Sequence, residues 1–398
     1  MTVTISGASA PGFDSVRAAF EAAFDGKPEM GAALAIRVDG ERVVDLWGGV
    51  SHERTAAPWL EQTPSVIFSC TKGISSILAA RLVQEGRLGY GDRVADYWPE
   101  FAAAGKADVR IKDLLSHRSG LSAPRESMTT EQIVDWDFVV ASLAAQEPLW
   151  EPDTGYAYHA LTHGWLIGEV IRRITGQSVG EYFHSLIAEP LHADAWIGLP
   201  EGLHDRVAHM HVGSTLATLI VNQAAARTPG VIDWSEQAMT LGGALDPALV
   251  TVDKDFNSPA IQSAEIPGAG GIATARALAS IWSATIVETD GVRLLEPDVI
   301  AEATVTQSEG SPVWDVPGPW PRWGMGFQLD SEARRYTGDR AFGHDGAGGQ
   351  VSFADPESGV GFAFLTNQME AIDDVRATRI VDSLREILRS NRGAVGFA

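Results

Sequence analysis

The sequence predicts a mixed α/β (α+β) fold, in which an antiparallel sheet is flanked by helices and a helical lobe is inserted into the chain. Strand-like runs with turn signals stand near both ends, and the middle of the chain has mostly helical patterns. The 398 residues exceed what one hydrophobic core usually supports. We therefore expect a discontinuous sheet lobe from residues 1–90 and 265–398, a mainly helical lobe from residues 91–264, and an active site in the cleft between them.

The first ninety residues contain two predicted helices and a hairpin. Residues 13–24 carry apolar side chains at helical spacing. Two strand-like runs, residues 32–38 and 42–47, are joined by Asp39-Gly40, and an Asp-Gly pair between such runs favours a hairpin. The short apolar run 66–68 then leads into a second helix, expected over residues 69–85, which Gly86 would end.

The remaining elements follow the same logic. Helices are expected over residues 131–143 and 161–174, where apolar residues repeat with a helical period. Beyond residue 265 the pattern returns to strands, at residues 323–329, 350–354 and 360–365, the last two joined by a turn over residues 355–359. An amphipathic helix that carries Ile380, Leu384 and Ile387 closes the chain.

Composition excludes several classes of partner. The formal net charge of −22 and the pI of about 4.8 disfavour binding to nucleic acid or to anionic membranes. The single cysteine, Cys70, excludes an intrachain disulfide and a thiolate-rich metal site. The start of the chain lacks a basic region followed by an apolar run, and no stretch approaches about 18 apolar residues. We expect a cytoplasmic protein, and the sequence leaves its oligomeric state open.

The chemistry begins with Ser69-Cys70-Thr71-Lys72, an S-x-x-K pattern at the expected start of a helix. Residues three apart share a helix face, so the hydroxyl of Ser69 and the amine of Lys72 can meet. We expect unpaired N–H groups at the helix start to stabilise an oxyanion, and burial of Lys72 to lower its pKa. On spacing alone, the alternative is a capping serine with an exposed lysine.

Five segments in a fixed order favour a catalytic role for Ser69 and Lys72 over a capping serine with an exposed lysine. They are FSCTKGISSILAARLVQEGRL at residues 68–88, DLLSHRSGL at 113–121, YAYHALTHGWLIGEVIRRITG at 156–176, IPGAGGIATARALA at 266–279 and FGHDGAGGQVSFADPESG at 342–359. S-x-x-K is the nucleophile signature of penicillin-binding proteins and class A β-lactamases. With these segments, the chain resembles the serine β-lactamase superfamily and, within it, the class C β-lactamase-like family VIII carboxylesterases. The resemblance implies a β-lactamase/penicillin-binding-protein-like fold.

The resemblance also implies roles for individual residues. Ser69 matches the nucleophile, Lys72 matches the lysine of the first motif, and Tyr158 matches the tyrosine of the second motif, which can shuttle the serine proton. The backbone N–H groups of Ser69 and Ala347 would form the oxyanion hole. His344 and Gly346 match the third motif and would contact substrate. Trp323, on a strand expected near the cleft, is a further candidate for the substrate pocket.

Two departures from the β-lactamase pattern bear on the substrate. The second motif normally reads Tyr-x-Asn, but here it reads Tyr158-His159-Ala160, so the amide is missing. The third motif has His344 where β-lactamases carry a lysine that suits an anionic β-lactam. Histidine is mostly neutral at pH 7, so His344 lacks the fixed positive charge that a lysine would offer to a carboxylate. The missing amide also weakens recognition of an anionic β-lactam, and both changes therefore favour neutral esters.

Four other features have plainer interpretations. Gly176-Gln177-Ser178-Val179-Gly180 matches the G-x-S-x-G nucleophile elbow, but a helix rather than a strand precedes it, so we expect a helix end and a capping box. The pair His209 and His211 lacks a third ligand and is expected to be a loop feature. We expect Cys70 to be a buried small hydrophobe and His117 to have a structural role.

The expected activity is hydrolysis of small carboxylic esters through an acyl-serine intermediate, with no metal or organic cofactor. Four rival interpretations stay open: a β-lactamase, a D-alanyl peptidase or amide hydrolase of the same fold, an acyltransferase, and a non-catalytic ligand-binding homologue.

Overall fold

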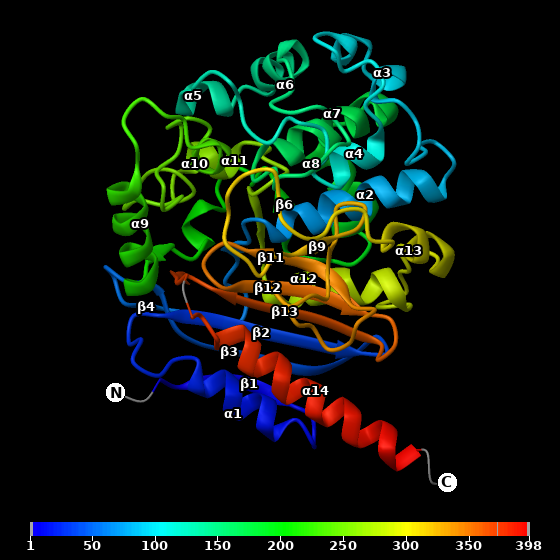
Figure 1. Cartoon of the computed structure of the whole chain (residues 1–398). Coiled ribbons are helices and arrows are strands. Elements are labelled where there is room, and N and C mark those ends of the chain that lie inside the picture. Colours follow the sequence, from blue (N-terminus) through cyan, green and yellow to red (C-terminus); the bar gives the residue numbers. More distant parts are fainter. Residues whose placement is uncertain (1–2, 372, 396–398) are drawn as a thin grey trace.

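A nine-stranded antiparallel sheet forms the centre of the computed structural model, which describes residues 3–371 and 373–395 (Figure 1). The strand order is β1-β3-β2-β13-β12-β11-β10-β9, and β4 pairs with β3. The strands are β1 (Ile5–Ser9), β2 (Gly31–Val38), β3 (Glu41–His52), β4 (Ala57–Pro58), β9 (Arg322–Trp323), β10 (Gln328–Leu329), β11 (Phe342–Gly346), β12 (Gln350–Asp355) and β13 (Val360–Thr366). Segments from both ends of the chain therefore share one sheet, as the sequence predicts.

The two ends of the chain join at the pair β2 and β13, where Leu34 lies opposite Phe364. The predicted hairpin between β2 and β3 is confirmed, since Asp39 and Gly40 both adopt positive φ, +49° and +85°. This is the backbone of the tight turn that an Asp-Gly pair favours.

Helices cover both faces of the sheet. The terminal helices α1 (Asp14–Ala22) and α14 (Arg376–Val395) pack on each other and on one face, in a core that includes Phe20, Phe364 and Ile380. The helices α2 (Cys70–Gln84) and α12 (Ala275–Ile286) cover the opposite face, where the larger core lies. Figure 1 shows these three layers, with the helical region beyond α2.

The middle of the chain is mainly helical. Its α-helices are α3 (Val94–Tyr97), α4 (Ile111–Leu115), α5 (Thr130–Ile133), α6 (Trp136–Ala145), α7 (Thr162–Thr175), α8 (Val179–Phe183), α9 (Ser214–Ala226), α10 (Trp234–Thr240) and α11 (Pro259–Ser263). Two short 3-10 helices, η1 (Pro99–Ala102) and η3 (His204–Arg206), and a short π-helix, η2 (His184–Ala188), stand between them. The helix α13 (Pro297–Ala303) follows α12. Two small sheets complete the fold: β5 (Ser65–Val66) with β8 (Gly271–Ala273) and β6 (Ala195–Ile197), and β7 (His211–Val212) with β14 (Gln368–Met369). The division into lobes at residues 90 and 265 stays a prediction.

Two predicted elements are wrong in detail. The single helix expected over residues 131–143 is divided into α5 and α6, because Asp135 leaves the helical conformation and its side chain caps α6 by accepting from the N–H of Phe138. The single strand expected over residues 323–329 is a pair of short strands, β9 and β10, because the chain reverses at Gly326, where φ is +82°.

Candidate active site

Ser69 stands at a sharp turn between β5 and α2. The residue before it, Phe68, is fully buried and has a φ of +42°, a conformation that costs a non-glycine residue about 1–3 kcal/mol. Thr71 helps to hold this turn, since its hydroxyl donates to the carbonyl of Phe68 at 2.5 Å and accepts from the N–H of Gly271 at 2.9 Å. The turn leaves Ser69 partly exposed at the N-cap of α2.

The expectation of several free N–H groups at the start of α2 is wrong. The N–H groups of Cys70, Thr71 and Lys72 donate to the carbonyls of the residues three positions earlier, at 2.9–3.1 Å. Among residues 3–371 and 373–395, no hydrogen bond engages the N–H of Ser69 or that of Ala347. Oxyanion stabilisation would therefore depend on those two groups rather than on the helix end as a whole.

Lys72 is fully buried and held by three oxygen atoms. Its Nζ lies 2.9 Å from Ser69 Oγ, 2.5 Å from the carbonyl oxygen of Ala160 and 2.7 Å from that of Gly268. Burial lowers the pKa of Lys72 well below its ordinary value, because desolvation penalises the ammonium. A neutral amine has two N–H groups, which the two carbonyls accept, and one lone pair, which then faces the Ser69 hydroxyl.

Tyr158 approaches the same hydroxyl from the loop before α7. Its phenol donates to Ser69 Oγ at 2.9 Å, and Lys72 Nζ lies 4.9 Å from the centre of its ring. The ring stacks on Trp323, with centroids 5.3 Å apart, and meets the edge of His117 at 5.0 Å. Burial raises the pKa of Tyr158, so the group is a phenol rather than a phenolate at neutral pH.

The turn between β11 and β12 packs against the start of α2. It runs from Gly346 through Ala347 to Gln350. A Cβ on Gly346 would lie 2.6 Å from the carbonyl oxygen of Ile67, so only glycine permits this approach. The Gln350 amide adds a second tie, donating to the carbonyl of Val66 at 2.7 Å. These contacts hold Ala347 close to the segment that carries Ser69.

His344 and Trp323 lie behind Tyr158. The imidazole of His344 is buried, and its Nδ1 donates to the carbonyl of Asp345 at 2.7 Å. Burial lowers the pKa of His344 to about 3, so the ring is neutral at pH 7. Trp323 is 3% exposed and packs between His344, at 5.3 Å, and Tyr158. Contact of either side chain with substrate stays a prediction.

His117, whose ring contacts Tyr158, lies beside two more histidines, and only His117 stands out in the sequence. His117, His159 and His163 are fully buried, with ring centroids 5.4 Å and 5.1 Å from His117 to the other two. The N–H of His159 donates to His117 Nδ1 at 3.2 Å, which supports the structural role expected for His117. Burial lowers the pKa of all three rings. His159 and His163 stand four residues apart, but His117 lies in a separate segment, so no spacing in the sequence connects all three rings.

Comparisons with known proteins identify the family of the chain. The chain matches the Beta-lactamase family model over residues 17–385. It belongs to the beta-lactamase family. It is 33% identical to the Esterase/beta-lactamase LipL of Mycobacterium tuberculosis over 370 residues, which cover 92% of this chain and 83% of LipL.

Solved structures confirm the beta-lactamase fold that the sequence predicts. A family VIII carboxylesterase superposes with a TM-score of 0.83 at 34% identity, over 96% of this chain and all of the other. A penicillin-binding protein homologue from Caulobacter crescentus superposes with a TM-score of 0.84 at 36% identity, with the same coverage. The resemblance to the beta-lactamase family and to its family VIII esterases is thus confirmed.

The G-x-S-x-G segment is a helix junction in this member of the beta-lactamase family. Gly176 ends α7 with a φ of +75°. The hydroxyl of Ser178 accepts from the N–H of Glu181, and the Glu181 carboxylate accepts from the N–H of Ser178. This reciprocal pair is the predicted capping box, so the structural interpretation of Ser178 is confirmed.

Cys70 is the buried small side chain that the sequence predicts: its thiol contacts the carbonyl of His344 at 3.1 Å, and burial raises its pKa to about 12. The expectation that His209 and His211 form a loop feature is wrong for His211, which lies in β7 and pairs with Gln368. His209 lies outside regular structure and stacks on His52 with ring centroids 4.4 Å apart. Within the described ranges, no group of three or more histidine, cysteine or acidic side chains could hold a metal ion, and no helix is long and apolar enough to cross a membrane.

Proposed function

We propose that this protein is a serine carboxylesterase that hydrolyses small neutral esters through an acyl-enzyme intermediate. One observation carries the proposal: Ser69 Oγ lies 2.9 Å from both Lys72 Nζ and the Tyr158 hydroxyl. A nucleophile within hydrogen-bonding reach of a base and an acid is the arrangement that acyl transfer needs. Its relatives support the proposal, since LipL is named an esterase and one structural neighbour is a family VIII carboxylesterase.

In the proposed acylation step, the neutral amine of Lys72 is the base and the phenol of Tyr158 is the acid. Neutral Lys72 accepts the proton of Ser69 while Oγ forms a bond to the ester carbonyl carbon, and the N–H groups of Ser69 and Ala347 donate to the oxyanion. When the carbon–alkoxy bond breaks, the Tyr158 phenol gives its proton to the departing oxygen. The proton held by Lys72 then restores the phenol, because both groups meet at Ser69 Oγ.

Deacylation reverses the same proton path. A water molecule loses a proton to the Lys72 and Tyr158 pair and attacks the acyl carbon, and Ser69 regains its proton as the acid departs. These steps use the three side chains, the backbone N–H groups of Ser69 and Ala347, and one water molecule as the second substrate.

The preference for neutral substrates rests on two positions. His344 is buried and neutral where β-lactamases have a lysine. The side chain of Ala160, where β-lactamases have an amide, packs with Ala123 and Ala238, and Leu149 and Trp234 pack against this group together with Tyr158. An apolar wall beside the phenol favours an uncharged acyl or alcohol group over a carboxylate.

Replacement of the nucleophile tests the proposal. Ser69→Ala should abolish hydrolysis of p-nitrophenyl acetate and butyrate, and a fluorophosphonate should label the parent protein at Ser69, as peptide mass spectrometry would show. Ser178→Ala is the matched control, since it alters a serine in the competing motif and should retain activity. A Ser69→Ala variant with ordinary turnover, or a phosphonate adduct on Ser178, would refute the assignment.

β-Lactam acylation is the second candidate, because one structural neighbour is a penicillin-binding protein homologue and LipL is also named a β-lactamase. A chromogenic cephalosporin assayed beside the esters separates the two candidates. If His344 sets the preference, His344→Lys should raise kcat/KM for the cephalosporin relative to the ester, whereas His344→Gln should not.

The cellular setting belongs to the proposal as well. A small-molecule ester is the proposed partner and the cytoplasm the proposed location, which cell fractionation with an antibody against the chain would test.

A further inference from the structure

The turn that carries Ala347 is braced by an arginine from the opposite layer of the fold. Arg376 is the first residue of α14, and its side chain is 4% exposed. Its Nη2 donates to the carbonyl of Gly348, the residue after Ala347, at 2.8 Å. The same carbonyl also accepts from the N–H of Glu370 at 3.3 Å. Two donors from the segment that leads into α14 and from α14 itself therefore fix this carbonyl of the turn.

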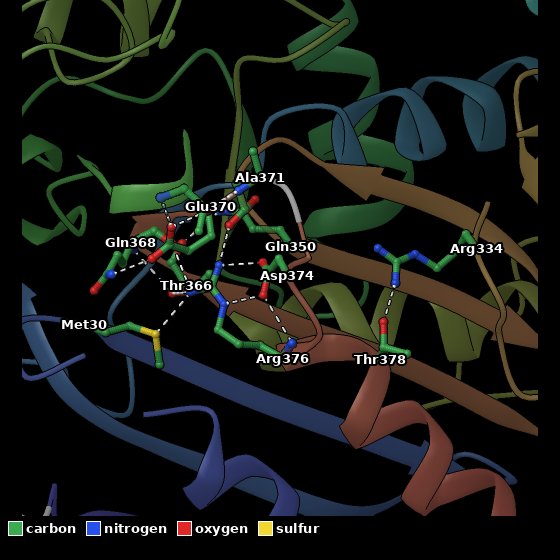
Figure 2. Close-up of polar contacts among 12 residues, drawn as sticks. Met30, Arg334, Gln350, Thr366, Gln368, Glu370, Ala371, Asp374, Arg376 and Thr378 are labelled. Atoms are coloured by element: carbon green, nitrogen blue, oxygen red, sulfur yellow. Dashed lines mark hydrogen bonds and ion pairs between the residues drawn. The ribbon is translucent and has the colours of Figure 1, made fainter. Parts of the chain in front are cut away.

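The guanidinium itself has little freedom to move. Its Nε and Nη2 donate to the two carboxylate oxygens of Asp374 at 2.8 Å and 2.7 Å. Its Nη1 donates to the carbonyl of Gln368 at 2.9 Å and contacts Met30 Sδ at 3.2 Å. Figure 2 shows Arg376 enclosed by these groups and by Thr366. A buried, two-point ion pair of this kind holds one geometry.

The ion pair also packs directly on the turn. A Cβ on Gly349, where φ is +105°, would lie 2.2 Å from Asp374 Oδ2 and 2.6 Å from Arg376 Nη2. Burial opposes ionisation of Asp374, but the hydrogen bonds and charge of Arg376 outweigh it and lower the pKa of Asp374. The pair is therefore charged at neutral pH, and it lies between the turn and the start of α14.

We propose that Arg376 is a positioning residue for the oxyanion hole: by fixing the carbonyl of Gly348, it holds the N–H of Ala347 in place to receive the negative charge of the transition state. This inference rests on the proposed function, because Arg376 can affect the rate through the turn only if the N–H of Ala347 donates to an oxyanion. Loss of one oxyanion donor typically costs about 100- to 1,000-fold in rate, so a donor that is displaced but not removed should cost less.

The test separates positioning from stability. Arg376→Met removes the brace, and Arg376→Lys keeps the charge but loses the two-point geometry. For p-nitrophenyl butyrate, we expect Arg376→Met to lower kcat about tenfold or more with KM changed less than threefold, and Arg376→Lys to recover part of the loss. The rate of fluorophosphonate labelling should fall together with kcat, because the phosphoryl oxygen also gains negative charge as Ser69 attacks phosphorus and displaces fluoride.

Arg37→Met is the matched control. Arg37 donates to the carbonyl of Gly40 at 2.5 Å in a hairpin turn and pairs with Asp290 at 2.6 Å. That turn contacts Gly359, at the end of the β12–β13 pair opposite the Ala347 turn. We expect Arg37→Met to lower Tm without changing kcat, when all variants are assayed well below their Tm.

Two outcomes would overturn the inference: folded Arg376→Lys and Arg376→Met with kcat within twofold of the parent, or a loss of kcat no larger than that of Arg37→Met. If Arg376→Met does not fold, circular dichroism will show it and Arg376→Lys alone decides. These outcomes are distinct from failure of the proposed function, which would appear as ordinary turnover by Ser69→Ala.

Discussion

The ring of Tyr158 lies nearly parallel to the indole of Trp323, with centroids 5.3 Å apart and an interplanar angle of 15°. Trp323 is 3% exposed, so its surface is occupied by protein groups that include His344 and His117. The indole thus fixes the plane from which the phenol reaches Ser69, and the phenol can hold its proton at one position.

Loss of this stacking should slow the reaction. Trp323→Leu removes the aromatic face, and an aromatic pair contributes about 0.5–1.5 kcal/mol beyond its buried area. We expect kcat for p-nitrophenyl butyrate to fall about tenfold, the rate equivalent of about 1.4 kcal/mol. Trp323→Phe, which can still stack, should retain most of kcat. Equal rates in the Leu and Phe variants would show that the stacking has no catalytic consequence.

The lowered pKa of Lys72 predicts the pH dependence of the reaction. Because the neutral amine is the base, kcat/KM should rise with pH through the depressed pKa of Lys72 and level off above it. Lys72→Arg, which stays protonated, should lose about 100-fold or more. The measurement is a kcat/KM profile between about pH 5 and 9 at constant ionic strength.

A control variant tests whether the increase of kcat/KM with pH, the rising limb of the profile, belongs to Lys72. His344, with a pKa of about 3, is already neutral throughout the range, so His344→Gln should keep the limb at the same pH whatever its absolute rate. If the limb disappeared in His344→Gln, the imidazole rather than the amine would be the group that titrates.

The four buried histidines predict a loss of stability in acid. The pKa values of His117, His159, His163 and His344 are lowered in the fold, so below about pH 6.5 the unfolded chain binds more protons than the folded one. Stability that is fully present above about pH 6.5 is therefore lost as pH falls towards the folded-state pKa values. Each such ring adds at most about 1.4 kcal/mol per pH unit to that loss.

Urea unfolding at several pH values between about 4 and 8 measures this slope. His163→Leu is the informative variant, because the ring is fully buried and desolvation holds its pKa well below the ordinary value. The variant should lower the number of protons taken up on unfolding by up to one, which reduces the slope of the unfolding free energy with pH. It should also raise stability at low pH. An unchanged slope would show that His163 is not held neutral by the fold.

The close approach at Gly346 predicts a severe effect from a single methyl group. A Cβ there would lie 2.6 Å from the carbonyl oxygen of Ile67, so Gly346→Ala must push the Ala347 turn away from the start of α2. We expect kcat to fall about 100-fold, at the lower end of the cost of losing one oxyanion donor. Gly91→Ala is the control, since a Cβ on Gly91 would meet no atom within 4 Å beyond its chain neighbours. A Gly346→Ala variant with kcat close to that of the parent would mean that the turn has no part in catalysis.

Local sequence signals determined much of this protein. The Asp39-Gly40 turn, the capping box at Ser178 and the glycine end of α7 at Gly176 depend on backbone preferences of a few neighbouring residues, and all three are as predicted. The S-x-x-K spacing likewise places Ser69 and Lys72 on one helix face, because helix geometry alone brings them together.

Only the tertiary structure decided how the chemistry is held. The carbonyls of Ala160 and Gly268 that hold Lys72, and the Arg376 brace on Gly348, join residues 28 to 196 positions apart in the chain. The positive φ of Phe68 is likewise imposed by packing on a residue that does not favour it. Such contacts depend on burial and on backbone groups that every residue has, so no pattern of residue types in the sequence predicts them.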